Sequence, residues 1–290
     1  AMACCGQVGP PGKGMVRFWE TSSGLAAGRL DVGKLPLAWD AEYSPGGKTI
    51  LVAGEDGTMR LLSAGGRDEM RCFSVPADAV EKGGAIRSVA FSPDGNLAVS
   101  GGADGAVRIW DVANGQQRRR LPGHKSAADA MAFSPDSSCV QSGGADGTVR
   151  LWDVGTGKLK LYLDGHRGAV TSVACSPGGT RALSGGADGS VRLWRLDTAE
   201  QQHRFEGHQG GVQCVAFSAN GRRAVSAGAD GTIRIWGLPA LSGAGQTVAI
   251  DPPGGPKIIR LGKPVPEPKA QEAAEERIRN GDFKADFAGA

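Results

Sequence analysis

Short segments in which apolar and polar residues alternate recur through most of the chain; Leu97 to Ser100 and Ala106 to Trp110 are two of them. Alternation with a period of two is typical of β-strands. Where such segments are bounded by Asp-Gly or Pro-Asp-Gly, they are typical of strands joined by tight hairpins. The pattern therefore predicts a chain built from strand–hairpin–strand units.

These units form an internal repeat. The sequence from Ser100 to Val112 recurs at 142–154, at 184–196 and, more loosely, at 226–238. The Asp-Gly pairs begin at Asp104, Asp146, Asp188 and Asp230, and the tryptophans stand at Trp110, Trp152, Trp194 and Trp236, in steps of 42 residues. A second block, Val-Ala-Phe-Ser-Pro-Asp-Gly and its variants, precedes each copy in the same phase. Each repeat thus predicts about four short strands.

A Gly-His pair, a hairpin Asp and a closing Trp-Asp mark the repeat. Gly-His occurs at 123–124, 165–166 and 207–208, and Trp-Asp at 110–111 and 152–153. Over residues 15–250 the chain resembles the WD40 repeat family, whose units of about 40 to 45 residues each form one four-stranded blade of a β-propeller. The resemblance implies an all-β fold of WD40-type blades.

Some units depart from this signature. Arg195 and Gly237 replace the closing Asp, Lys82 stands where later repeats have His, and Leu62 replaces the tryptophan of an earlier unit. The first twenty residues resemble the end of one more unit. We therefore expect five complete four-stranded blades plus the second half of another, in a chain that starts mid-blade as a fragment of a bacterial protein.

The chain is expected to contain three regions. Residues 1–250 form the propeller, residues 251–268 a Pro/Gly-rich linker, and residues 269–290 the helical start of a truncated second domain. Lys269 to Asn280 carries apolar residues at helical spacing. Before it, 246–250 or 257–261 could supply one more strand, pairing back to the N-terminal partial blade.

The in-phase polar residues look catalytic at first sight, but the resemblance implies a structural role. In the family, His, Ser, Asp and Trp form one hydrogen-bonded set within each blade. Carried over, the sets are His124, Ser142, Asp146 and Trp152; His166, Ser184, Asp188 and Trp194; and His208, Ser226, Asp230 and Trp236. A set repeated once per blade is architecture, because one active site does not need three copies. We expect no catalytic, cofactor-binding or metal-binding residues.

Composition adds few constraints. The 47 glycines indicate many tight turns, and a net charge of +3 gives no electrostatic case for nucleic acid. No stretch is long and apolar enough to predict a membrane span. Six cysteines without a Cys-x-x-Cys motif weakly favour a reducing compartment, so we expect a cytoplasmic protein; a lost signal peptide stays open.

The favoured function is a non-enzymatic scaffold that binds a protein or peptide through the top face, the face with the Gly-His turns and the starts of the inner strands. Candidate contact residues on that face are Trp39, Arg87, Lys125, Arg167, Gln209 and Gln213. The alternative is a non-catalytic repeat domain fused to an enzyme or signalling domain outside this sequence. The basic run Arg118–Arg120 is assigned to an outer strand, where it blocks edge-to-edge association or binds an acidic partner.

Overall fold

The computed structural model describes residues 2–6, 15–19, 26–31, 37–65, 68–76, 84–121, 123–239 and 257–260. Residues 1–259 form one compact unit and 260–290 another, of which Arg260 alone is described. The described residues contain strands and turns and no helix. The expected helix at 269–280 and the candidate strand at 246–250 lie outside the described residues.

Five four-stranded sheets follow one another along the chain, and in each the strand order is the chain order. The first two contain β4 (Ala38–Tyr43), β5 (Thr49–Gly54), β6 (Thr58–Ser63) and β7 (Glu69–Ser74), then β8 (Ile86–Phe91), β9 (Leu97–Gly102), β10 (Val107–Asp111) and β11 (Gln117–Leu121). The next two contain β12 (Ala128–Phe133), β13 (Cys139–Gly144), β14 (Thr148–Asp153) and β15 (Leu159–Asp164), then β16 (Val170–Cys175), β17 (Arg181–Gly186), β18 (Val191–Arg195) and β19 (Gln201–Phe205). The last contains β20 (Val212–Phe217), β21 (Arg223–Gly228), β22 (Thr232–Gly237) and β23 (Lys257–Arg260). The expected all-β fold with five complete blades is confirmed.

The sixth sheet is incomplete. It contains β1 (Met2–Gly6), β2 (Met15–Trp19) and β3 (Ala26–Asp31) in antiparallel register. The two strands expected near the N-terminus are both present, and β3 adds a third. At the other end, β23 lies beside β22 and completes the last sheet, so it does not pair with the N-terminal sheet.

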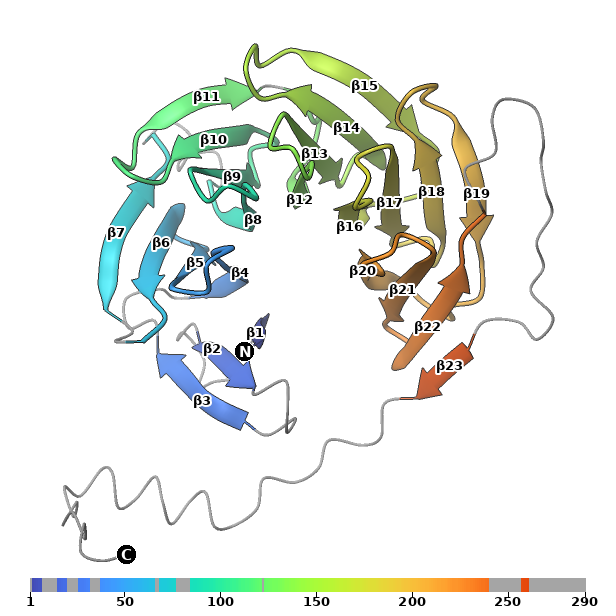
Figure 1. Ribbon diagram of the computed structural model, residues 1–290, viewed down its shortest axis with the longest axis horizontal. Coiled ribbons are helices and arrows are strands. Elements are labelled where there is room, and N and C mark those ends of the chain that lie inside the picture. Colours follow the sequence, from blue (N-terminus) through green and yellow to red (C-terminus); the bar gives the residue numbers. More distant parts are fainter. Residues whose placement is uncertain are drawn as a thin grey trace, which may run out of the picture. The chain divides into compact units, whose positions relative to one another are not determined.

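Successive sheets pack against each other through their first strands. β1 lies against β4, β4 against β8, β8 against β12, β12 against β16, and β16 against β20 (Figure 1). The apolar core lies between neighbouring sheets. One cluster joins Leu51 and Phe73 of the first sheet to Ile86 and Trp110 of the second, and Phe73 meets Trp110 edge to face at 6.0 Å between ring centroids. No sheet could bury its apolar faces alone, so each depends on its neighbours.

The arginine run lies on an outermost strand, as expected. Arg118 pairs with Asp111 of its own sheet, while Arg119 donates to the carbonyl oxygens of Val154 and Gly155 in the next sheet. Both guanidinium groups therefore have partners within the protein. Arg119 also connects two neighbouring sheets at their outer edge.

Glycine in the second strand permits the next sheet to approach. A Cβ at Gly101 of β9 would lie 2.4 Å from the carbonyl oxygen of Ala128 in β12. That oxygen belongs to the backbone and has little freedom to move. Gly101→Ala should lower the free energy of unfolding by roughly 1–3 kcal/mol, as overpacked sites do; chemical denaturation measures it.

Gly178→Ala is the matched control, because nothing lies within 4 Å of a Cβ there. It should change the free energy of unfolding by less than about 0.5 kcal/mol. Equal losses of unfolding free energy in Gly101→Ala and Gly178→Ala would show that the close approach of β12 to β9 does not cause the loss at Gly101.

Candidate functional site

Each of the last three sheets contains a buried polar network between its entry segment and its central hairpin. In the sheet of β12, His124 Nε2 lies 2.7 Å from Ser142 Oγ, and His124 Nδ1 lies 3.0 Å from Asp146 Oδ1. The indole nitrogen of Trp152 donates to Ser142 Oγ at 2.8 Å. The sets of His166 and His208 repeat this geometry with distances of 2.8 to 3.1 Å.

The donors and acceptors fix where the protons lie. The indole N–H of Trp152 can only donate, so Ser142 Oγ accepts it and gives its own proton to His124 Nε2. His124 Nδ1 then carries the ring hydrogen and donates to Asp146. Burial is the main reason that the pKa values of His124 and His166 are lowered, which favours this neutral imidazole.

The aspartate is the most connected member. Asp146 also accepts from the Thr148 hydroxyl at 2.7 Å and from the Lys125 amide at 3.0 Å. Burial by itself would raise the pKa of Asp146, but these bonds and that from His124 hold it well below its usual range. The carboxylate thus joins the entry segment to the hairpin of the same sheet.

An arginine four residues after each hairpin Asp belongs to this arrangement, although the sequence analysis did not single it out. The pairs are Asp56–Arg60, Asp104–Arg108, Asp146–Arg150, Asp188–Arg192 and Asp230–Arg234, with distances of 2.6 to 3.9 Å. The signal in the sequence was the recurring Asp-Gly-x-x-Arg. In the sheet of β8, this arginine supplies the cation closest to the hairpin Asp.

Serine, histidine and aspartate in this order could in principle activate a nucleophile, but here the hydroxyl is inaccessible. Ser142 and Ser184 are fully buried and Ser226 is 1% exposed. Each also accepts the tryptophan N–H that holds it in place. No substrate could reach these oxygens while the blade stays folded.

Side chains that could contact a partner lie at the starts of the inner strands, which are the first strands of the five four-stranded sheets. Each inner strand begins with a β-bulge, so that one residue lies outside the ladder of cross-strand pairs. These five residues, the rim row, are Trp39, Arg87, Asp129, Thr171 and Gln213. Trp39, Arg87 and Gln213 were expected from the sequence, whereas Asp129 and Thr171 were not. A step of 42 residues from Arg87 would have found both.

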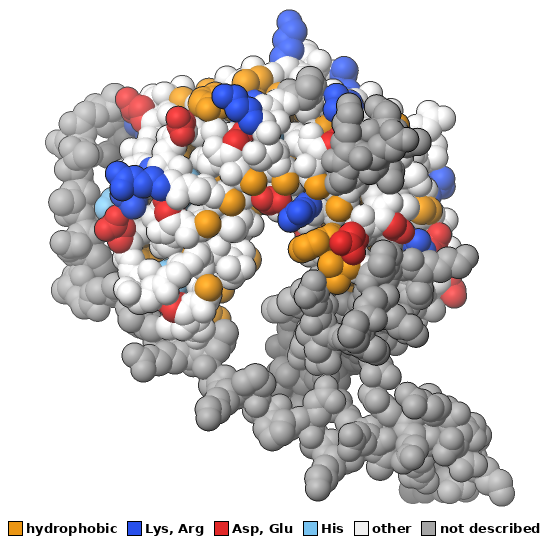
Figure 2. Space-filling model, turned by 180° about the vertical axis from the view of Figure 1, so that it is seen from behind, with side chains coloured by type: hydrophobic (Ala, Val, Ile, Leu, Met, Phe, Trp, Pro, Cys, Tyr) orange, Lys and Arg blue, Asp and Glu red, His pale blue; other side chains and the backbone are white. Residues whose placement is uncertain are grey.

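Three members of the rim row contact one another across three sheets. The Arg87 guanidinium carbon lies 4.8 Å from the centroid of the Trp39 ring, and Arg87 Nη1 lies 3.9 Å from Asp129 Oδ1. Trp39 is 38% exposed although it is a large aromatic residue. Figure 2 shows hydrophobic, basic and acidic side chains next to one another at the inner margin of the described sheets.

Asp129, at the end of this chain of contacts, has a carboxylate oxygen without a hydrogen-bond partner among the described residues. Burial raises the pKa of Asp129, and its Oδ1 atom accepts no hydrogen bond among the described residues. At 3.9 Å the arginine is too far away to donate one. A donor group from a bound partner would therefore satisfy Asp129.

The other three candidates lie on the Gly-His turns. The side chains of Lys125, Arg167 and Gln209 are exposed, while their backbone amides donate to Asp146, Asp188 and Asp230 at 2.9 to 3.0 Å. The buried networks thus fix the backbone of these turns, and the three side chains remain accessible to solvent. No hydrogen bond, ion pair or cation–π contact in the described part of the chain joins these three side chains to the rim row.

A metal site and a membrane-spanning helix are both absent from the described residues. They contain no group of three or more His, Cys, Asp or Glu side chains placed to hold a metal ion. Nor does any helix within them have the length and apolar character needed to cross a membrane.

Comparison with known proteins gives one family match. The model described as "WD domain, G-beta repeat" matches residues 79–111, 115–153, 157–195 and 199–237. The four matches end 42 residues apart, in step with the repeat.

Individual relatives match shorter stretches. The transcription factor unc-37 of Caenorhabditis elegans is 27% identical over 41% of this chain, and the meiotic recombination protein rec14 of Schizosaccharomyces pombe is 32% identical over 36%. The small ribosomal subunit protein RACK1z of Oryza sativa subsp. japonica is 51% identical over 12%. The matches cover 20%, 32% and 10% of those proteins, about a third of their length or less.

Asp146→Ala should destabilise the protein by roughly 1–3 kcal/mol, because it removes the acceptor for His124, Thr148 and the Lys125 amide. Thermal and chemical unfolding measure the loss. Asp164→Ala, at an exposed position on an outer strand, is the matched control and should leave stability nearly unchanged. An unaltered unfolding curve for Asp146→Ala would contradict the structural role of the network.

Proposed function

This chain belongs to the WD40 repeat family, and we propose that it acts as a non-enzymatic scaffold that binds a protein or peptide partner through its top face. The observation that carries the proposal is the contact chain Trp39–Arg87–Asp129, built by three different sheets at the starts of their inner strands. Side chains from several repeats converge there, and no single repeat could form such a surface alone.

The chemistry of the rim row suits a partner's backbone and side chains. Trp39 offers an exposed ring, and Trp and Arg are the residues that contribute most binding energy at interfaces. Asp129 offers an unsatisfied acceptor beside them. A segment that covers the Trp39 ring and donates to Asp129 would therefore gain both apolar burial and a hydrogen bond.

The surrounding turns support the same face. Lys125, Arg167 and Gln209 stand on backbone that the buried networks hold in place, so little ordering of the loops is needed when a partner binds. Gln213 at the end of the rim row is exposed as well. The name of one relative, a small ribosomal subunit protein, places that relative in a large assembly, which agrees with a scaffold role here.

A catalytic function has no comparable support. The three Ser–His–Asp sets are buried, and the rim row lacks a nucleophile paired with a base. We therefore propose that whatever chemistry the partners carry out, this repeat domain supplies their binding surface.

Trp39→Ala and Arg87→Ala should each weaken partner capture by about 2 kcal/mol or more, about thirtyfold in affinity, because each removes one half of the cation–π contact and exposes its neighbour. Affinity capture from the source lysate with quantitative mass spectrometry identifies the retained protein. Titration of that purified protein gives the affinities.

Two control variants locate the interface. Arg222→Ala removes an exposed arginine from the turn between β20 and β21, at the opposite end of the inner strands, and should retain full capture. Arg119→Ala tests the outer edge of the sheets. Loss of capture in the Arg119 variant alone would move the interface to that edge and overturn the proposal.

A further inference from the structure

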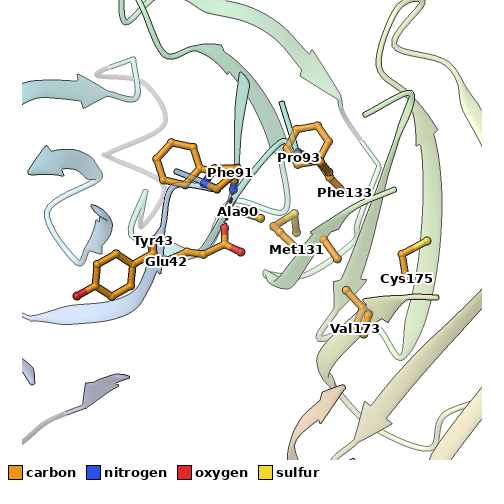
Figure 3. A pocket seen from close by; sticks show the side chains of 12 residues that line it. Glu42, Tyr43, Ala90, Phe91, Pro93, Met131, Phe133, Val173 and Cys175 are labelled. Atoms are coloured by element: carbon orange, nitrogen blue, oxygen red, sulfur yellow. Dashed lines mark hydrogen bonds between the residues drawn. The ribbon is translucent and has the colours of Figure 1, made fainter. Parts of the chain in front are cut away.

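A second concave surface lies at the other end of the inner strands, away from the rim row. It is a cavity of about 420 Å³ where β4, β8, β12 and β16 end (Figure 3). Met131, Phe133 and Val173 supply part of an apolar wall, and Pro45 and Pro93 come from the turns that follow the strands. Its volume is within the range of about 300–1,000 Å³ that is usual for ligand sites.

One carboxylate interrupts this apolar lining. Glu42 of β4 stands at the position that Ala90, Ala132 and Ala174 occupy in the next three repeats, and all four line the cavity. Alanine is sufficient for packing at this position, as three neighbouring sheets show. A charged side chain is therefore not required for packing at this position.

The Glu42 carboxylate has one oxygen engaged and one unused. Oε2 accepts the Phe91 amide of β8 at 2.5 Å, and the dashed line in Figure 3 marks this bond. Oε1 accepts no hydrogen bond from the described residues, and no lysine, arginine or histidine among them forms an ion pair with Glu42. Figure 3 shows the carboxyl group directed from β4 toward β8, with Met131 beyond it.

The surroundings make an unpaired negative charge unfavourable there. Although the side chain is exposed to the cavity, the protein around it raises the pKa of Glu42 to about 7, mainly through desolvation and also through the charge of Asp40. A cation bound at Oε1 would offset both effects, whereas a purely apolar occupant would bury the carboxylate further.

We propose that this cavity receives a basic side chain, lysine or arginine, from a partner segment. The aliphatic stem packs on Met131, Phe133 and Val173, and the cationic end pairs with Glu42 Oε1. The stem buries apolar area and the charge gives selectivity over neutral side chains of the same shape. The site is separate from the rim row and does not depend on the proposed function of the top face.

The experiment compares n-butylguanidinium with n-butylurea, which has nearly the same shape and no charge. Binding to the full chain is followed by the ¹⁵N–¹H signal of the Phe91 amide, which donates to Glu42. The cation should bind at least about tenfold more tightly than the urea, a difference of about 1.4 kcal/mol. Glu42→Gln keeps an acceptor for the amide and should remove that preference.

Glu55→Gln is the matched control, because it removes the same charge from an exposed turn of the same sheet. It should leave the preference intact. Ala174→Met, which fills the cavity and leaves Glu42 in place, should abolish binding of both compounds. Equal binding of the two compounds to the wild type, or a preference that survives in Glu42→Gln, would overturn the proposal, as would the absence of any response of Phe91.

The pH dependence provides an independent readout. Ionisation of Glu42 near pH 7 should tighten binding of the cation as the pH rises from 6 to 8, and Glu42→Gln should remove this change. The other titratable groups at or beside the cavity are Asp40, Tyr43 and Cys175, and burial raises the pKa of the Cys175 thiol to about 11. A pH dependence that persists in Glu42→Gln would contradict the assignment to Glu42.

Discussion

A buried imidazole held between a serine hydroxyl and an aspartate carboxylate links the entry segment of each of the last three sheets to the hairpin at its centre. Buried polar groups are stabilised when their donors and acceptors are paired within the protein. Trp152 donates to Ser142, Ser142 to His124, and His124 to Asp146, so each proton has one destination. The network therefore fixes where the entry segment lies, and with it the start of the inner strand.

The buried networks lie next to the proposed binding surface. Asp129 follows His124 by five residues, and the bulge at the start of β12 turns it out of the strand ladder. The first two sheets contribute Trp39 and Arg87 to the same rim. In these two sheets the hairpin carboxylates accept hydrogen bonds from side chains of the same hairpin. Asp56 accepts from the Thr58 hydroxyl, and Asp104 accepts from the Arg108 guanidinium. Buried positions repeat along the chain, whereas the rim positions change from aromatic to basic to acidic, as the proposed binding surface would require.

Much of the fold follows from the sequence because its cause is local. The alternation, the Asp-Gly turns and the 42-residue step depend on neighbouring residues, and they predict five four-stranded sheets. Contacts between repeats do not follow in this way. Asp129 meets Arg87 across two adjacent sheets, and each is the bulged residue at the start of its strand. The ends of four strands form the cavity that Glu42 lines, and no pattern within its own repeat predicts this cavity.

The account depends most directly on the proton positions in the buried networks, and ¹⁵N nuclear magnetic resonance of the histidine side chains measures these. At pH 7, His124 and His166 should be neutral, with the hydrogen on Nδ1 facing aspartate and a bare Nε2 accepting from serine. A hydrogen on Nε2, or an imidazolium ion, would contradict the account. The serine hydroxyl would then have no acceptor at histidine, and the chain of donors from tryptophan to aspartate would be broken.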